Sequence, residues 1–320
     1  MSRKSLLTLI YAAIVFAAVL IIMTACTESG RAAPKIENVA GKGDGKYTFT
    51  FDSLEHDMIL DLPEKPEGSP LVVMLHGQGN TAESFRSAVH FEESANPRGY
   101  AVVYVTAAAD PEQPSYGIGW NSGLTDGKNR DVELLKAVTD YLIDGYGFDK
   151  KRVFAAGFSN GAFMTHRLAM EADGTFAAVA SVAGFMTEYV WNERKEKNHI
   201  GVFQITGQKD EVVPKTSDKS ASHSNAPAIE DVMDYWVSSN GLQKTEEIKI
   251  GKKDSPLTKY AGTGSGPQVW DLFVIDGRHS WPDEKINGID TNDLILDFFD
   301  ACTKNMDRGS YLLFFCRNYK

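Results

Sequence analysis

Two kinds of hydrophobic pattern occur in the chain after about residue 47. Segments 47–51 and 56–62 alternate apolar with polar side chains, as half-buried strands do. Segments 71–75 and 101–105 are instead short and almost wholly apolar, which is typical of central parallel strands that are covered on both faces. All four segments therefore predict strands.

Further along the chain, helical spacing alternates with more short apolar runs. The predicted helices are 132–146, 161–170, 229–237 and 294–299, and the predicted strands are 153–156, 177–182, 202–206 and 269–275. Alternating strands and helices predict an α/β fold in which a mainly parallel sheet has helices on both faces. In such sheets the functional site lies at the carboxyl ends of the strands.

The first 25 residues have the pattern of an export signal. Arg3 and Lys4 precede a mostly apolar run from Leu6 to Met23, and small residues then lead to Cys26. The stretch Met23-Thr24-Ala25-Cys26 resembles a bacterial lipobox, so we expect Cys26 to be lipidated and to become the mature amino terminus. The alternative is an uncleaved membrane anchor, since about 18 apolar residues just span a bilayer. Both interpretations place the body of the protein outside the cytoplasm, at a bacterial membrane.

The remaining chain divides into a flexible tether at 26–46, one domain at 47–302 and a tail of unknown role at 303–320. The whole chain has 33 Lys and Arg against 43 Asp and Glu, and this acidic balance argues against a nucleic-acid partner. Its three cysteines are too few for a four-thiolate zinc site and no C-x-x-C motif occurs, and we expect no metal and no cofactor. Cys302 and Cys316 form a disulfide bond in one interpretation. In the alternative they are not bonded, and Cys302 is a small buried residue.

A candidate nucleophile lies in the motif Gly157-Phe-Ser159-Asn160-Gly161, between a predicted strand and a predicted helix. This context is that of a nucleophile elbow, in which flanking glycines allow a strained turn that exposes the serine. A serine needs a histidine base and a carboxylate that orients the imidazole. Asp210 follows the strand 202–206 and His279 follows the strand 269–275, so both fall at carboxyl ends. Glu211 and Asp276 are the alternatives to Asp210.

A second loop could stabilise the negative charge that acyl transfer builds on a carbonyl oxygen. His76-Gly77-Gln78-Gly79 follows the buried strand 71–75. In this architecture one backbone N–H comes from the residue after the nucleophile and one from this early loop. We therefore expect the oxyanion hole to consist of Asn160 and Gln78.

These motifs together resemble the α/β-hydrolase superfamily, and within it the secreted esterases that include polyhydroxybutyrate depolymerase-like proteins and the feruloyl and acetylxylan esterases of carbohydrate esterase family one. The resemblance extends over Leu71–Gly79, Gly119–Asn121, Arg130–Val132, Arg152–Phe163, Ser181–Gly184, Gly207–Pro214 and His279–Pro282. It implies that 47–302 is a catalytic domain. This chain differs from many relatives at two places. It has Asn160-Gly161-Ala162 where they have a second glycine, and it has Asp276-Gly277-Arg278 where they have glycines before the histidine.

The resemblance implies a serine carboxylic-ester hydrolase that acts through an acyl-enzyme. We expect a feruloyl or acetyl ester on a plant polysaccharide, with Trp120 and Trp281 as aromatic walls of the substrate site or, alternatively, as buried supports of the catalytic loops. Three further functions stay open: a polyhydroxybutyrate depolymerase-like esterase, a serine peptidase on the same fold, and a non-catalytic binding lipoprotein. A peptidase of this fold usually has an extra domain for which 320 residues leave little room.

Overall fold

An eleven-stranded sheet forms the centre of the computed structural model, which describes residues 34–172, 174–213, 225–264 and 266–303. The strands lie in the order β1-β2-β3-β5-β4-β6-β7-β8-β11-β10-β9. The six strands from β5 to β11 in this order run parallel, and antiparallel strands complete both edges. The strands are β1 Glu37–Gly43, β2 Lys46–Phe51, β3 Leu54–Asp61, β4 Leu71–Leu75, β5 Ala101–Val105, β6 Val153–Phe158, β7 Ala178–Val182, β8 Gly201–Gly207, β9 Gln243–Ile250, β10 Ser255–Ala261 and β11 Gln268–Val274.

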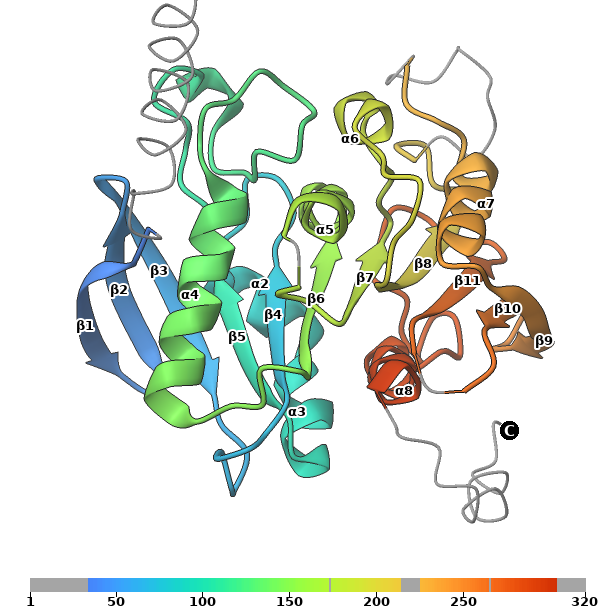
Figure 1. Cartoon of the computed structure of the whole chain (residues 1–320), viewed down its shortest axis with the longest axis horizontal. Coiled ribbons are helices and arrows are strands. Elements are labelled where there is room, and N and C mark those ends of the chain that lie inside the picture. Colours follow the sequence, from blue (N-terminus) through green and yellow to red (C-terminus); the bar gives the residue numbers. More distant parts are fainter. Residues whose placement is uncertain (1–33, 173, 214–224, 265, 304–320) are drawn as a thin grey trace, which may run out of the picture. The chain divides into compact units, whose positions relative to one another are not determined.

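Helices cover both faces of this sheet. The α-helices are α2 Ala82–Val89, α3 Phe91–Ala95, α4 Asp131–Tyr146, α5 Asn160–Glu171, α6 Glu188–Asn192, α7 Ile229–Ser239 and α8 Thr291–Thr303, with 3₁₀ turns at Asn96–Arg98 and Pro114–Tyr116. Buried side chains of α4, α5 and α7 pack in one hydrophobic cluster, whereas those of α2, α3 and α8 pack in another. Figure 1 shows α4 in front of the strands and α2 behind them. The central strands are therefore buried on both sides, as their apolar sequences require.

The order of the strands reverses at β4. From β4 the chain crosses to β5 on one side, and it then returns to β6 and continues through β7 and β8 on the other side (Figure 1). A parallel sheet has its ligand crevice at such a reversal, outside the carboxyl ends of the strands. The loops after β4 and β6 meet at this point, and these two loops contain the candidate oxyanion and nucleophile residues.

The fold class predicted from the sequence is confirmed, and the central strands begin and end within two residues of the prediction. The prediction of a flexible tether at 26–46 is wrong from Glu37 to Gly43, where β1 pairs with β2 in antiparallel register. Nearly every residue of β1 is exposed, so its stability comes from ladder hydrogen bonds and leaves no hydrophobic pattern to detect. The sequence analysis also missed β9 and β10.

Several predictions concern residues outside the described ranges: the signal segment 1–25, the lipidation of Cys26 and the tail beyond Thr303. Cys302 is described, and it is a buried residue of α8 whose thiol pKa is raised to about 12 by burial. Its partnership with Cys316 stays a prediction. Within the described ranges, no helix has the length and apolar character needed to cross a bilayer.

Candidate active site

Ser159 occupies a strained turn between β6 and α5. Its backbone has φ 53° and ψ −117°, a region that non-glycine residues rarely adopt. A Cβ at Gly157 would lie 2.3 Å from the carbonyl oxygen of Gly161, and a Cβ at Gly161 would lie 2.1 Å from that of Leu75. The two glycines of the motif therefore allow the strand, the turn and the helix to approach one another, and the serine stands at the carboxyl end of the sheet.

The side chains of Ser159, His279 and Asp210 form a continuous hydrogen-bonded row. His279 Nε2 lies 2.9 Å from Ser159 Oγ, and His279 Nδ1 lies 2.9 Å from Asp210 Oδ2. The imidazole is one-quarter exposed and the carboxylate is fully buried. The three residues come from loops after β6, β11 and β8, so the topology of the sheet brings together residues that are far apart in the sequence.

The environment of Asp210 keeps this carboxylate ionised. Burial pushes its pKa upward, but the hydrogen bonds from His279 and from the backbone N–H groups of Val212 and Val213 outweigh burial, and the pKa lies below its ordinary value. An ionised carboxylate beside Nδ1 favours the tautomer with the proton on Nδ1, which leaves the lone pair of Nε2 toward Ser159 Oγ.

The alternative carboxylates occupy other environments. Asp276 is exposed and forms ion pairs with Lys209 at 2.7 Å and with Lys253 at 3.9 Å. Glu211 is exposed as well. Of the three candidates, Asp210 is the one whose carboxylate meets His279.

The backbone N–H groups of Gln78 and Asn160 follow β4 and Ser159, respectively. Among the described residues, neither N–H donates a hydrogen bond. The loop that contains Gln78 is held by its side chain, which donates from Nε2 to the carbonyl oxygen of Tyr116 at 2.5 Å. The assignment of these two N–H groups to an oxyanion hole stays a prediction.

His76 fixes the base of the same loop. Its Nε2 accepts from the N–H of Ala107 at 3.0 Å, so its Nδ1 carries the proton and donates to the carbonyl oxygen of Gly77 at 2.8 Å. Burial lowers the pKa of His76 to about 4, which keeps the ring neutral and compatible with this arrangement. Both ring nitrogens of His76 are thus hydrogen-bonded to the backbone, and its role is to position the loop.

The Trp120 side chain is buried, and the prediction that it forms a wall of the substrate site is wrong. Its indole is 1% exposed, and its Nε1–H donates to the carbonyl oxygen of His76 at 3.0 Å. Its backbone N–H donates to Asn160 Oδ1 at 2.6 Å, and Asn160 Nδ2 donates back to its carbonyl oxygen at 3.2 Å. Trp120 thus connects the loop after β4 with the residue that follows the nucleophile.

Trp281 lies in a different environment. Its Nε1–H donates to Asn292 Oδ1 at 3.0 Å, and its ring packs edge-on against Phe85 at 5.7 Å between centroids. It lines a hollow of about 210 Å³ with Val89 and other residues, but no triad residue lines that hollow. A substrate role for Trp281 therefore stays a prediction.

Two structural features near the site were missed from the sequence. The ring of Phe158 lies 5.2 Å from that of His279. The second feature is a pair of hydrogen bonds to the backbone of Asn121. Asp131 Oδ2 accepts from the N–H of Asn121 at 2.6 Å, and Arg167 donates to the carbonyl oxygen of Asn121 at 2.6 Å. Asp131 is buried and burial raises its pKa to about 7. The family resemblance covered Asn121 and Asp131, but a sequence pattern cannot indicate that they touch.

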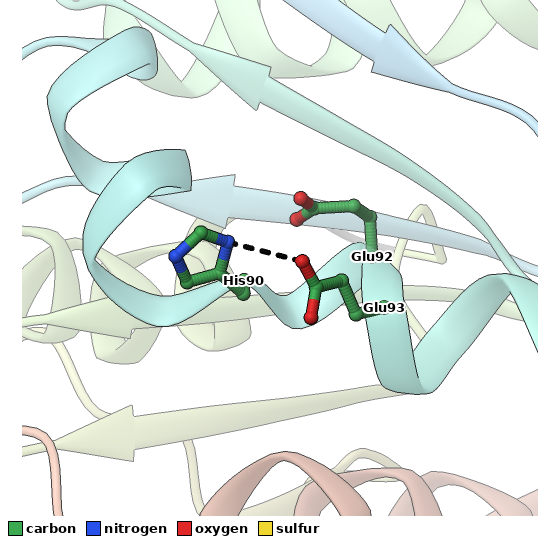
Figure 2. A group of neighbouring side chains, drawn as sticks. All are labelled: His90, Glu92 and Glu93. Carbon is green, nitrogen blue, oxygen red and sulfur yellow. Dashed lines mark ion pairs between the residues drawn. The ribbon is translucent and has the colours of Figure 1, made fainter.

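One cluster among the described residues has the ligand types and spacing of a metal site: His90, Glu92 and Glu93. Figure 2 shows His90 turned toward Glu93, with Nδ1 and Oε1 3.4 Å apart. Glu92 is occupied by other partners, because one oxygen lies 3.1 Å from Arg86 and the other accepts from Tyr104 at 2.7 Å. A guanidinium at this distance repels a cation. The proximity of the three side chains is therefore explained by these ion pairs and hydrogen bonds.

Comparison with known proteins gives one peptidase family model and relatives that are named as esterases. Residues 84–232 match the model of the Prolyl oligopeptidase family. "Putative esterase NocK" of Nocardia uniformis subsp. tsuyamanensis is 29% identical over 242 residues, which are 69% of this chain and 67% of that protein. "Feruloyl esterase B" of Thermothelomyces thermophilus is 28% identical over 132 residues, or 40% of this chain and 43% of that protein. The chain therefore spans two thirds of the first relative and under half of the second.

The solved structures agree on the fold. The acetyl xylan esterase from Aspergillus awamori superposes with a TM-score of 0.54 at 17% identity, over 76% of this chain and 93% of that one. The S-formylglutathione hydrolase from Agrobacterium tumefaciens gives the same TM-score at 11% identity, over 84% of this chain and 99% of that one. The strand order and these solved structures show that the chain has the α/β-hydrolase fold, and the relatives found by sequence are named as esterases.

Proposed function

We propose that Ser159, His279 and Asp210 are the catalytic triad of a carboxylic-ester hydrolase that acts through an acyl-enzyme. The observation that carries the proposal is the pair of 2.9 Å hydrogen bonds that join the three side chains. The strained φ of Ser159 adds support, since it exposes Oγ at the crevice where the strand order reverses.

The geometry supports a two-step reaction. Nε2 of His279 takes the proton from Ser159 Oγ as Oγ attacks the ester carbonyl, and the negative charge moves to the carbonyl oxygen, where the N–H groups of Gln78 and Asn160 stabilise it. The C–O bond to the alcohol then breaks and His279 returns the proton to the leaving oxygen. A water molecule repeats the sequence on the acyl-enzyme and releases the acid. Asp210 stays ionised and stabilises the imidazolium throughout.

The substrate that we propose is an acetyl or feruloyl ester on a plant polysaccharide. Relatives named as feruloyl and acetylxylan esterases support this choice, and a hydroxybutyrate oligomer is the alternative ester. The match to the Prolyl oligopeptidase family favours a second candidate, a serine peptidase with the same triad. Both candidates use one nucleophile, so they differ in the bond that is cleaved.

We further propose that the protein is exported and held on a membrane by lipid on Cys26. The charged start, the apolar run and the small residues before Cys26 support this location. The lipoprotein modification supplies at least two acyl chains, whereas a single chain gives only marginal membrane binding.

Matched ester and amide substrates test the activity. Wild-type protein is assayed on acetyl and feruloyl esters, on a hydroxybutyrate trimer and on amides with the same acyl groups, and Ser159→Ala is assayed alongside. We expect esters to be cleaved at least about a hundredfold faster than amides, a difference of about 2.7 kcal/mol in barrier, and activity to disappear in Ser159→Ala. Equal or faster cleavage of amides would favour the peptidase, and activity in Ser159→Ala would overturn the triad.

A further inference from the structure

A hollow of about 590 Å³ has Gly123 and Thr187 in its lining, whereas Ser159, Asp210 and His279 are not among its lining residues. One wall is the loop that begins at Gly123, and the other is formed by Phe185 and by α6. Asn160 Nδ2 donates to Ser122 Oγ at 3.3 Å, and Thr187 Oγ1 donates to the carbonyl oxygen of Ser122 at 3.1 Å. Two hydrogen bonds through Ser122 therefore connect Thr187, which lines the hollow, with Asn160, which follows Ser159. Its size is that of a small-molecule site.

Gly123 allows the two walls of this hollow to approach each other closely. Its φ is +80°, and a Cβ there would lie 2.7 Å from the ring of Tyr189 and 3.1 Å from Thr187 Oγ1. The loop can therefore pack directly against the first turn of α6 only because this residue has no side chain. Tyr189 is fixed on one side by this contact.

The ring of Tyr189 has one occupied face. The guanidinium of Arg167 lies 5.1 Å from its centroid, and Arg167 is itself held by Glu171 and by the carbonyl oxygen of Asn121. The residue is nevertheless 47% exposed and lines the hollow. A rigid aromatic ring that is open to the hollow is suited to stacking on the C–H face of a ring-shaped ligand.

The polar side chains of the hollow are acidic or neutral. Asp126, Glu188, Asn192 and Asn225 line it, and each is exposed. Within the described ranges these four side chains form no hydrogen bond or ion pair, and no Lys or Arg lines the hollow. Carboxylates and amides are acceptors and donors that suit hydroxyl groups, whereas the two carboxylates repel an anionic ligand.

We propose that this hollow binds the neutral carbohydrate that forms the alcohol part of the ester, with the sugar ring stacked on Tyr189. The inference rests on the proposed function and deepens it, because it names the part of the substrate that is recognised and the residues that recognise it. It also assigns a role to α6, at whose end Asn192 lies.

A binding experiment tests the hollow independently of catalysis. Unesterified xylotetraose, cellotetraose, mannotetraose and tetragalacturonate are titrated into the full mature protein, and binding is followed by calorimetry. We expect at least one neutral tetrasaccharide to bind, Tyr189→Ala to weaken its binding at least about fivefold, and Tyr189→Phe to retain it. Tyr141→Ala is the matched control, since Tyr141 is a 41% exposed tyrosine on α4 outside the hollow.

Three outcomes of the titration would overturn the inference. The first is no neutral sugar bound up to about 20 mM, the second is unchanged binding in Tyr189→Ala, and the third is tightest binding of the anionic tetragalacturonate. A thermal melt of each variant accompanies the titration, so that a loss of binding by unfolding is recognised, and Tyr189→Phe then decides the result.

A kinetic experiment separates this inference from the proposed function. For Tyr189→Ala we expect kcat/KM to fall about tenfold, through KM, on an acetylated xylo-oligosaccharide and to change less than about twofold on 4-nitrophenyl acetate, which has no sugar. Equal losses on both esters would overturn the sugar site. If wild-type protein hydrolyses no ester but binds a neutral sugar through Tyr189, the proposed function falls and the sugar site stands.

Discussion

Replacement of Asp210 by asparagine should disable the base without disturbing the fold. Asp210 Oδ1 accepts from the N–H groups of Val212 and Val213 at 2.8 and 3.2 Å, and Oδ2 faces Nδ1 of His279 at 2.9 Å. An asparagine has a single oxygen, and the two backbone donors fix it at the Oδ1 position. The amide NH₂ then points at Nδ1 of His279, which must become an acceptor. The imidazole proton moves to Nε2, and Nε2 can no longer take the proton of Ser159.

The expected loss in kcat is about 10³- to 10⁴-fold, equal to about 4–5.5 kcal/mol of barrier. The assay is hydrolysis of 4-nitrophenyl acetate at saturating substrate, with a thermal melt to verify that Asp210→Asn is folded. Asp276→Asn is the matched control, because Asp276 is an exposed carboxylate that pairs with Lys209, and it should retain activity within about twofold. A loss below about tenfold in Asp210→Asn, or an equal loss in Asp276→Asn, would refute the assignment of the acid.

Three further outcomes are expected, two from the structure and one from the sequence. Trp120→Phe should lower the free energy of unfolding by about 1–3 kcal/mol in urea denaturation, because it leaves the carbonyl oxygen of His76 without its donor; an unchanged midpoint would contradict this role. Asp131 has a pKa of about 7 in the fold, raised above its unfolded value. The stability that it contributes is complete below about pH 4 and is lost as pH rises toward 7, by at most about 1.4 kcal/mol per pH unit. Asp131→Asn should flatten this decline in urea midpoints between pH 4 and 8, and an unchanged slope would argue against it. Cys26→Ser should move the exported protein from the membrane fraction to the soluble fraction, and a native amino terminus other than modified Cys26 in mass spectrometry would reject the anchor.

The sequence predicted the parts of the fold in which local pattern and burial agree. Leu71–Leu75 and Ala101–Val105 are buried strands with the predicted bounds, because a parallel strand covered on both faces must be apolar throughout. The exposed strands β1 and β9 were missed for the opposite reason, since their side chains face solvent and the ladder stabilises them.

At the candidate site, the sequence predicted the residues whose position depends only on their order in the chain and on the ends of the strands. Ser159, Asp210 and His279 each follow a strand, and the sheet brings them together. The role of Trp120 could not be predicted in this way, because its burial depends on a carboxamide from Asn160 and a carbonyl from His76 in distant segments. The hollow beside Tyr189 could not be predicted from the sequence either, because its lining comes from the loop at Gly123 and from α6, which meet only in the folded chain.

The residue that reacts with an active-site-directed phosphonate is the most direct test of the proposed chemistry. The purified protein is treated with a fluorophosphonate, digested and mapped by mass spectrometry, with His279→Ala and Ser159→Ala in parallel. Because Nε2 of His279 lies 2.9 Å from Ser159 Oγ, we predict one adduct per chain, on Ser159, formed rapidly in the wild type, slowed by several orders of magnitude in His279→Ala and absent from Ser159→Ala. An adduct on any other serine, or undiminished labelling of Ser159→Ala, would contradict the assignment of the nucleophile.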